Sequence, residues 1–77
     1  MSQNWMVCFT NVGRGKQSWN ETLHQQPTEA IVTTLVKRKR ALMSNDVECA
    51  FEDDDSGRGT IFAGLYVVGR FCIEPIP

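Results

Sequence analysis

The sequence predicts a small α+β fold, an antiparallel β-sheet with one helix packed on one face, in the chain order strand, helix, strand, strand. Three observations predict it. Apolar residues alternate with a mixed set along 60–74, as the side chains of a β-strand do. Apolar residues recur at helical spacing from Thr28 to Met43. Acidic residues, a serine and glycines at 53–59 are typical of a turn that joins two strands into a hairpin.

The first strand is expected at residues 4–12, where aromatic and apolar side chains occupy one alternating face. Glycines and polar residues follow at 11–18, which is the composition of a loop. We interpret the whole connection up to Gln26 as loop. Its Trp19 is expected to fill one end of the core, because tryptophan is highly buried on average.

The helix is expected to begin within a few residues of Pro27, since proline suits the first helical position, and to end near Met43. Lys39 falls on the apolar side of the helix, so we expect its alkyl chain to cover core residues while its ammonium reaches water. The residues that form the apolar stripe are Thr28, Ile31, Val32, Leu35, Val36, Leu42 and Met43.

Residues 47–52 alternate between apolar and acidic or small side chains, which indicates a half-buried strand with an acidic outer face. The turn at 53–59 leads into the last strand, 60–74, which either runs straight or bends into two strands at Gly64 or Gly69. Because the helix connects the first strand with the second, these two strands can lie parallel, either adjacent or separated by the last strand. The sequence leaves this order open.

The two faces of the 60–74 segment differ in character. Its odd-numbered face is wholly apolar and is expected to lie on the core, with Ile61, Leu65, Val67 and Phe71 as its larger members. Its even-numbered face is mixed and includes Phe62, Tyr66 and Val68. An apolar patch on an exposed face indicates a partner. The alternative is that the long loop folds over this face, with Trp19 as the cover, and removes the apolar patch from water within the chain itself.

Length, charge and cysteine content exclude several classes of protein. The 77 residues, 42% of them hydrophobic, are expected to form one domain near the lower size limit for unaided folding. A formal net charge of −1 argues against nucleic-acid binding driven by bulk charge. The three cysteines are an odd number and no secretion signal is evident, so free thiols and a cytoplasmic location are expected. Every apolar run is far shorter than the roughly 20 residues of a membrane-spanning helix.

No enzymatic, cofactor or metal site is predicted. Residues 52–63 place carboxylates near a glycine as a calcium loop does, but its twelfth position is Ala63, which cannot supply the bidentate carboxylate. Residues 13–18 lack the spacing of a phosphate-binding loop. His24 is the only histidine, and no cysteine lies near it in the sequence to make a catalytic pair.

We therefore predict a non-enzymatic, cytoplasmic protein–protein interaction module that uses the outer sheet face or the edge of the long strand. Self-association as a homodimer is its simplest form. A second form is an accessory protein, of the kind viruses such as phages and other mobile elements carry, that inhibits a host machine by occluding a site. The residues expected to contact the protein partner are Phe62 and Tyr66 as aromatic anchors, Arg70 as a polar anchor, and Asp53, Asp54 and Asp55 as an acidic steering element.

The alternative is a small protein that binds single-stranded nucleic acid. Bases would stack on Phe62 and Tyr66 across an open sheet, and basic side chains would hold the phosphates. The candidate phosphate ligands are Arg14, Lys16, Lys37, Arg38, Arg40, Arg58 and Arg70. The cations at 37–40 are also explained by the favourable interaction of positive charge with a helix C-terminus. A salt titration separates the two readings, because phosphate contacts weaken steeply with ionic strength.

Overall fold

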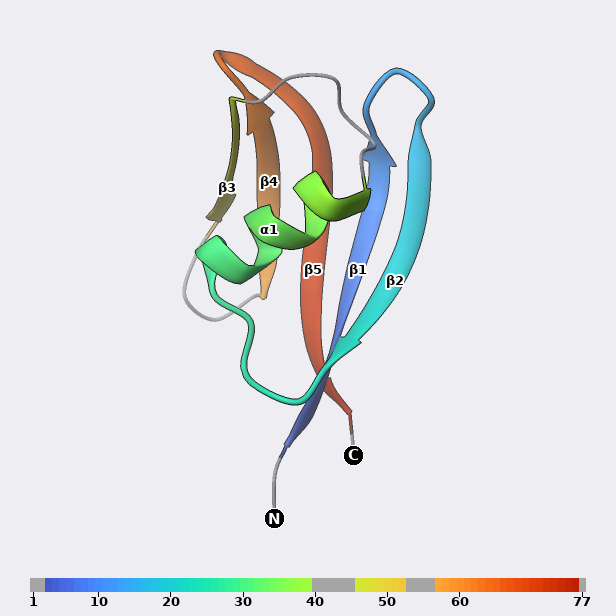
Figure 1. Ribbon diagram of the computed structural model, residues 1–77, viewed down its shortest axis with the longest axis vertical. Coiled ribbons are helices and arrows are strands. Elements are labelled where there is room, and N and C mark those ends of the chain that lie inside the picture. The colour runs from blue at the N-terminus through green and yellow to red at the C-terminus, as the bar shows by residue number, and fades with distance from the viewer. Residues whose placement is uncertain (1–2, 40–45, 53–56, 77) are drawn as a thin grey trace.

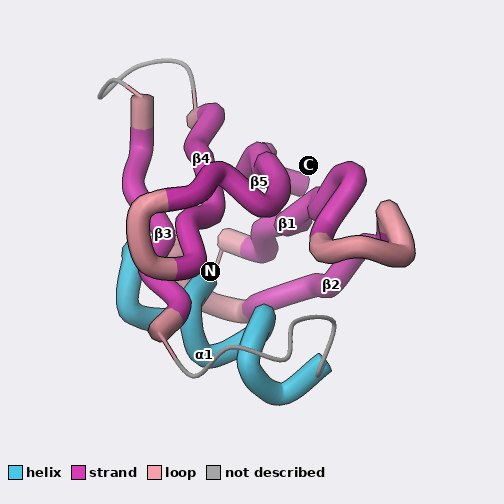
Figure 2. The backbone as a smooth tube through the Cα atoms, turned by 90° about the horizontal axis from the view of Figure 1, so that it is seen from above, coloured by secondary structure: helices cyan, strands magenta, loops and turns pink. Residues whose placement is uncertain are grey.

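A computed structural model of the chain describes residues 3–39, 46–52 and 57–76. It contains one five-stranded antiparallel sheet and, among the described residues, a single helix that covers one face of the sheet (Figures 1 and 2). This confirms the predicted α+β class. The elements are β1 (Asn4–Val12), β2 (Gln17–Leu23), α1 (Glu29–Lys39), β3 (Val47–Phe51), β4 (Arg58–Ala63) and β5 (Tyr66–Ile76).

The strand order across the sheet is β2-β1-β5-β4-β3, and every neighbouring pair is antiparallel. β5 is therefore the central strand, and the edges of the sheet are β2 and β3. The expectation that β1 and β3 can lie parallel is wrong: β5 and β4 separate them, and three successive antiparallel pairings make them run in opposite directions. The prediction that the long strand offers a free edge is also wrong, because β1 and β4 occupy both of its sides.

β2 lies where the sequence indicated a loop. Its side chains alternate, with Trp19, Glu21 and Leu23 on the helix side and exposed polar residues on the other. A strand at the edge of a sheet needs few apolar residues, so its signal in the sequence is weak. β2 also reverses the chain before the helix, which explains the strand directions: the crossover through α1 joins β2 to β3, and these two run the same way.

The helix begins at Glu29, within the predicted distance of Pro27, but Pro27 lies one residue before the cap. Thr28 is the N-cap: its Oγ1 accepts a hydrogen bond from the N–H of Ile31 at 3.3 Å, and its carbonyl accepts one from Val32 at 2.9 Å. The predicted end near Met43 falls outside the described residues. α1 crosses the middle of the sheet from the β3 side toward the β1 side (Figure 1).

The core lies between α1 and the sheet. Its geometry depends on Gly59, which stands opposite Phe71 in the neighbouring strand. The Phe71 ring covers this glycine so closely that a Cβ there would lie 2.2 Å from Cζ of Phe71. Phe51 meets the same ring edge to face, with centroids 5.4 Å apart. The buried members of the core are Val7, Phe9, Val12, Val32, Leu35, Val36, Val47, Cys49, Ile61 and Phe71.

The predicted bend in the long C-terminal strand is a full reversal, because Ala63 pairs directly with Tyr66 across a turn made of Gly64 and Leu65. Such a two-residue turn exchanges the faces, so that an odd-numbered residue in β4 pairs with an even-numbered one in β5. A β-bulge at Val68 then restores the original alternation, and Ile61 pairs with Gly69.

The expected core positions Leu65 and Val67 are consequently wrong: both side chains are exposed. Leu65 belongs to the turn itself and not to either strand. Val67 pairs with Phe62 on the face of the sheet opposite to the helix. Val68, which was expected on the outer face, instead packs against the core.

Candidate functional site

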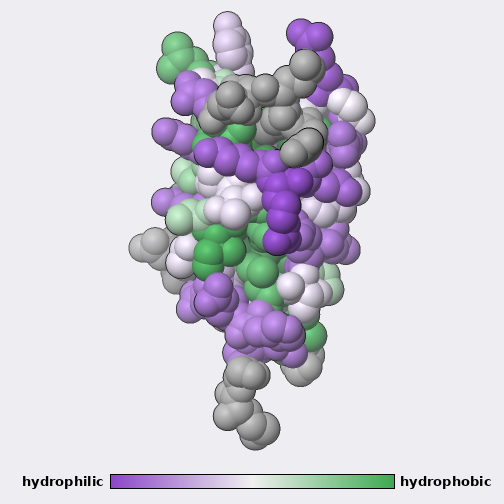
Figure 3. All heavy atoms as spheres, viewed as in Figure 1, coloured by the Kyte–Doolittle hydropathy of each residue, from purple (hydrophilic) through white to green (hydrophobic). Residues whose placement is uncertain are grey.

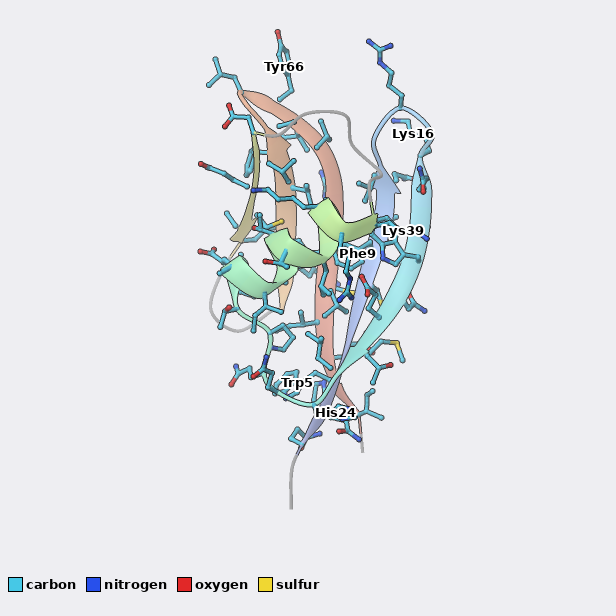
Figure 4. All side chains as sticks on the ribbon, viewed as in Figure 1. Trp5, Phe9, Lys16, His24, Lys39 and Tyr66 are labelled. Carbon is cyan, nitrogen blue, oxygen red and sulfur yellow. The ribbon has the colours of Figure 1, made fainter. Side chains whose placement is uncertain are left out.

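The candidate site is the hairpin tip, which we define as Gly64–Val67 at the end of β4 and β5. Its three apolar residues are the large hydrophobic side chains that the described structure leaves exposed: Leu65 is 97% exposed, Tyr66 76% and Val67 58%. Tyr66 projects from the end of the sheet (Figure 4). Exposed apolar side chains that occur singly need no explanation, but three in sequence at one protruding point make the tip the candidate contact surface.

The turn requires a glycine but no leucine. Gly64 has a φ of 62°, whereas Leu65 stays outside the positive-φ region, which is the pattern of a type II′ turn with glycine first. The N–H of Gly64 donates to the carbonyl of Asp46 at 2.9 Å and so ties the tip to the start of β3. The backbone of the tip is therefore held in one shape, while the Leu65 side chain has no role in the fold.

Phe62 and Tyr66, the two predicted aromatic anchors, do not share a face. Phe62 pairs with Val67 and with Glu48 on the outer face, the face of the sheet away from the helix. Tyr66 pairs with Ala63 on the helix side. The prediction that the two rings share one face is wrong, because it assumed one uninterrupted alternation, and the turn at Gly64 breaks that alternation. Phe62 is half-buried, so Tyr66 is the more available of the two.

The other predicted partner-binding residues have different positions. Arg70 lies exposed on the outer face, opposite Thr10 of β1 and Thr60 of β4. It therefore shares a face with Phe62 and Val67 and not with Tyr66. The acidic residues Asp53, Asp54 and Asp55 lie outside the described residues.

The outer face is less apolar than the sequence suggested, and no element within the described part of the chain covers it (Figure 2). Trp19 does not cover it: Trp19 lies on the helix side, stacked on Phe9 with ring centroids 4.5 Å apart. Half-buried apolar and sulfur-bearing side chains on this face are interleaved with exposed polar ones. The former include Met6, Cys8, Ala50, Phe62 and Cys72, and the latter include Thr10, Asn20, Glu48, Arg58, Arg70 and Glu74.

The predicted phosphate ligands are divided among separate parts of the fold. Arg14 and Lys16 lie in the β1–β2 turn. Arg58 and Arg70 lie on the outer sheet face, while Lys37 and Arg38 belong to the last turn of α1 on the opposite side of the sheet. Arg40 lies outside the described residues. Such a distribution does not form one phosphate-binding track.

Contacts within the chain account for two of the cations of α1, Arg38 and Lys39. Arg38 forms an ion pair with Glu21 of β2 at 2.8 Å. The same carboxylate accepts a hydrogen bond from the indole N–H of Trp19 at 3.1 Å. The Lys39 ammonium lies 5.5 Å from the centroid of the Trp19 ring, a cation–π contact. The space-filling view of the helix side shows hydrophilic residues interspersed with apolar ones (Figure 3).

The fold brings together two cysteines that are far apart in the sequence. Cys8 and Cys72 are directly opposite each other in β1 and β5, whereas Cys49 is buried beneath the helix. Burial raises the pKa of Cys8, and the neighbouring Cys72 and then Glu74 raise it further. Burial also raises the pKa of Cys49, with Glu29 acting in the same direction and a hydrogen bond with Thr33 opposing it.

The described residues offer no group of three or more histidine, cysteine or carboxylate side chains arranged to hold a metal ion. His24 hydrogen-bonds through Nδ1 with the side-chain oxygen of Asn4 at 2.9 Å. No helix within the described ranges has the length and apolar character needed to cross a membrane. No protein-family model, curated protein or solved structure matches the chain.

Proposed function

We propose that this chain is a non-enzymatic protein-binding module whose main anchor is the hairpin tip. The observation that carries the proposal is Leu65, an apolar side chain exposed over 97% of its surface at a turn position where the fold makes no use of it. Tyr66 and Val67 extend the apolar surface on the two sides of the sheet. A partner with an apolar pocket would receive Leu65, with Tyr66 beside it.

The energetics of the tip support this role. Transfer of a side chain such as leucine from water into an apolar pocket contributes about 1.5–3 kcal/mol. The hydrogen bond from Gly64 to Asp46 and the pairing of Ala63 with Tyr66 already hold the backbone in place, so binding loses little backbone entropy. Tyrosine is also among the residues enriched at the energetic centres of protein interfaces.

The edge of the sheet at β3 is less available for strand addition. The N–H of Phe51 is already bound to Oε2 of Glu29 at 2.9 Å, so the first residue of α1 occupies one of the edge groups that another strand would need. β3 is also only five residues long. A contact centred on the tip therefore agrees better with the geometry than β-augmentation on this edge.

Self-association is the simplest form of this function, with the tip of one copy buried against another. Insertion of the same tip into a functional site on a different protein would occlude that site. In either form Arg70 and the acidic residues at 53–55 are proposed to orient the partner through charge, which affects association rate and specificity more than affinity.

Site-specific photocrosslinking tests the proposal. A photoreactive residue is placed at Leu65 in one variant and at Arg14 in a matched control, since both positions are exposed in β-turns at the same end of the sheet (Figure 1). We expect a discrete protein adduct, or a crosslinked dimer of this chain, from position 65 and none from position 14. Sedimentation velocity over a range of concentrations measures the dimer independently. Equal crosslinking from both positions would contradict the proposal.

An oligonucleotide-binding measurement tests the nucleic-acid alternative. Binding of a fluorescent single-stranded oligonucleotide that weakens steeply with added salt and survives Leu65→Ser would indicate phosphate contacts elsewhere on the chain. We expect no such binding, because the cations occupy separate places and Phe62 and Tyr66 lie on opposite faces.

A further inference from the structure

The central strands β1 and β5 carry two thiols directly opposite each other. Cys8 pairs with Cys72, and the register continues on both sides, with Val7 opposite Ile73 and Phe9 opposite Phe71. Both thiols are half-buried on the outer face, which no described element covers. Burial raises the pKa of the Cys8 thiol, and Cys72 is close enough to Cys8 to help raise it. The two sulfur atoms are thus neighbours in the resting fold.

This geometry suits a disulfide bond. Directly opposite residues in an antiparallel pair have Cα atoms about 4.5–5.5 Å apart. The Cα separation across disulfide bonds is usually about 4.4–6.8 Å, so the two requirements overlap. Because paired residues on either side hold the strands in register, we expect the sulfur atoms to join mainly through side-chain rotation.

The third thiol cannot take part from its position. Cys49 is on the helix side of β3, opposite Ile61, while Cys8 and Cys72 project from the other face of the sheet. Cys49 is also buried in the core and hydrogen-bonded with Thr33. Cys49 is therefore a core residue, whereas Cys8 and Cys72 form a pair on the outer face of the sheet.

We propose that Cys8 and Cys72 form a redox-active dithiol, which a low-molecular-weight disulfide such as glutathione disulfide converts to an intramolecular disulfide. The thiolate of one cysteine attacks a sulfur of glutathione disulfide, forms a mixed disulfide and releases one glutathione thiolate. The thiolate of the second cysteine then attacks the protein sulfur of this mixed disulfide and releases the second glutathione. The two protein thiols lose two electrons and two protons, and one glutathione disulfide becomes two glutathione thiols.

The bond would join the first strand of the chain to the last at the centre of the sheet. It closes a loop that contains most of the chain, including α1, so it restricts the unfolded state strongly. The oxidised protein is therefore more resistant to unfolding than the dithiol form. The hairpin tip takes no part in the thiol chemistry, so formation of the disulfide does not depend on the proposed binding function.

Mass spectrometry after redox equilibration tests the proposal. The reduced full chain is incubated with mixtures of glutathione disulfide and glutathione, quenched with N-ethylmaleimide in denaturant and weighed intact. We expect the main product to carry one maleimide and an otherwise unmodified chain lighter by about 2 Da, since two hydrogen atoms are lost. Trypsin, which cleaves after Arg14 and Arg70, should then yield residues 1–14 linked to residues 71–77.

Three cysteine variants identify the thiols that form the disulfide. Cys8→Ser and Cys72→Ser should each stop at the glutathione adduct, which is heavier by about 305 Da, because the resolving thiol is missing. Cys49→Ala should form the same linked peptide as the wild type. The midpoint of urea denaturation should rise on oxidation in the wild type and in Cys49→Ala but not in the two serine variants.

Two outcomes would overturn the proposal. The first is stable glutathione adducts on Cys8 and Cys72 of the wild type, without a linked peptide, since neighbouring thiols must resolve the mixed disulfide. The second is a disulfide that involves Cys49 or that joins two chains, because either would show that Cys8 and Cys72 are not the preferred pair.

Discussion

The β4–β5 hairpin has a base and a tip that are similarly apolar in sequence but opposite in burial. In the base, Ile61 and Phe71 are buried, and Gly59 lies beneath the Phe71 ring. In the tip, Leu65 is almost wholly exposed and Tyr66 is largely exposed. The helix crosses the middle of the sheet, and the tip extends beyond it (Figure 1). A hydrophobic side chain is buried only where another layer of the fold reaches it, so hydropathy alone does not separate a core segment from a contact surface.

Removal of the Phe71 ring should produce the largest loss in the base. Phe71→Ala leaves a cavity between Phe51 and Gly59, and such a change costs about 3–5 kcal/mol of unfolding free energy. Urea denaturation followed by circular dichroism measures it, with Phe71→Leu as a milder control. A loss below about 1 kcal/mol would show that the base is not the packed half of the hairpin.

Addition of one methyl group at Gly59 should be the next largest effect. In Gly59→Ala the new Cβ meets Cζ of Phe71 at 2.2 Å and the carbonyl oxygen of Ala50 at 2.7 Å, and the second contact is with backbone that cannot rotate away. Overpacking of this kind costs about 1–3 kcal/mol.

Gly15→Ala is the matched control for Gly59→Ala, because its Cβ would meet only the flexible Gln17 side chain, at 3.7 Å. It should change stability by no more than about 0.5 kcal/mol. Thermal unfolding of both variants under one condition makes the comparison. Equal effects at the two glycines would contradict the close packing described for the base.

Alkaline pH should weaken the base through Cys49, which pairs with Ile61. Its folded-state pKa is raised above the ordinary value of 9.0, chiefly by burial, so the native thiol keeps its proton where the unfolded chain has lost it. The stabilising contribution is full below about pH 9 and is lost as the pH rises through the folded-state pKa.

A comparison of the wild type with Cys49→Ala isolates the contribution of the Cys49 thiol to the pH dependence of stability. The decrease in unfolding free energy between about pH 8 and about pH 10 should be smaller in the variant, and Cys8, whose pKa burial also raises, should account for part of what remains. Urea denaturation under reducing conditions at both pH values measures the slopes. Identical slopes would show that Cys49 is not held protonated by burial.

Changes at the tip should have the smallest effect on stability. Leu65→Ser should shift the unfolding free energy by no more than about 0.5 kcal/mol, because an exposed side chain loses no packing. The same change should abolish self-association or partner binding in sedimentation or pull-down measurements. Lys16→Ser in the β1–β2 turn is the control and should leave binding intact. A stability loss comparable with that of Phe71→Ala would place Leu65 in a core and remove the basis for the binding surface.

Several elements could be predicted from the sequence because local signals specify them. The helix follows from the apolar stripe and from Pro27 near its start, and β1 and β3 follow from alternation. Gly64 is one of the two glycines at which the sequence predicts a bend, and in the structure it takes the positive φ of a chain reversal. For the candidate site, the alternation predicts Tyr66 as an anchor on the outer face together with Phe62, and places Leu65 in the core. The structure leaves Tyr66 exposed but on the helix side, and it leaves Leu65 exposed as well.

Most of the helix and strand segments therefore follow from local sequence patterns, because periods of 3.6 and 2 residues are properties of neighbouring residues. Contacts between distant parts of the chain place β5 between β1 and β4, bring Cys8 opposite Cys72 and leave Leu65 exposed. The physical reason is that strand pairing and burial depend on residues distant in the chain: backbone hydrogen bonds between strands do not identify their partner, and a side chain is buried only when a second layer covers it.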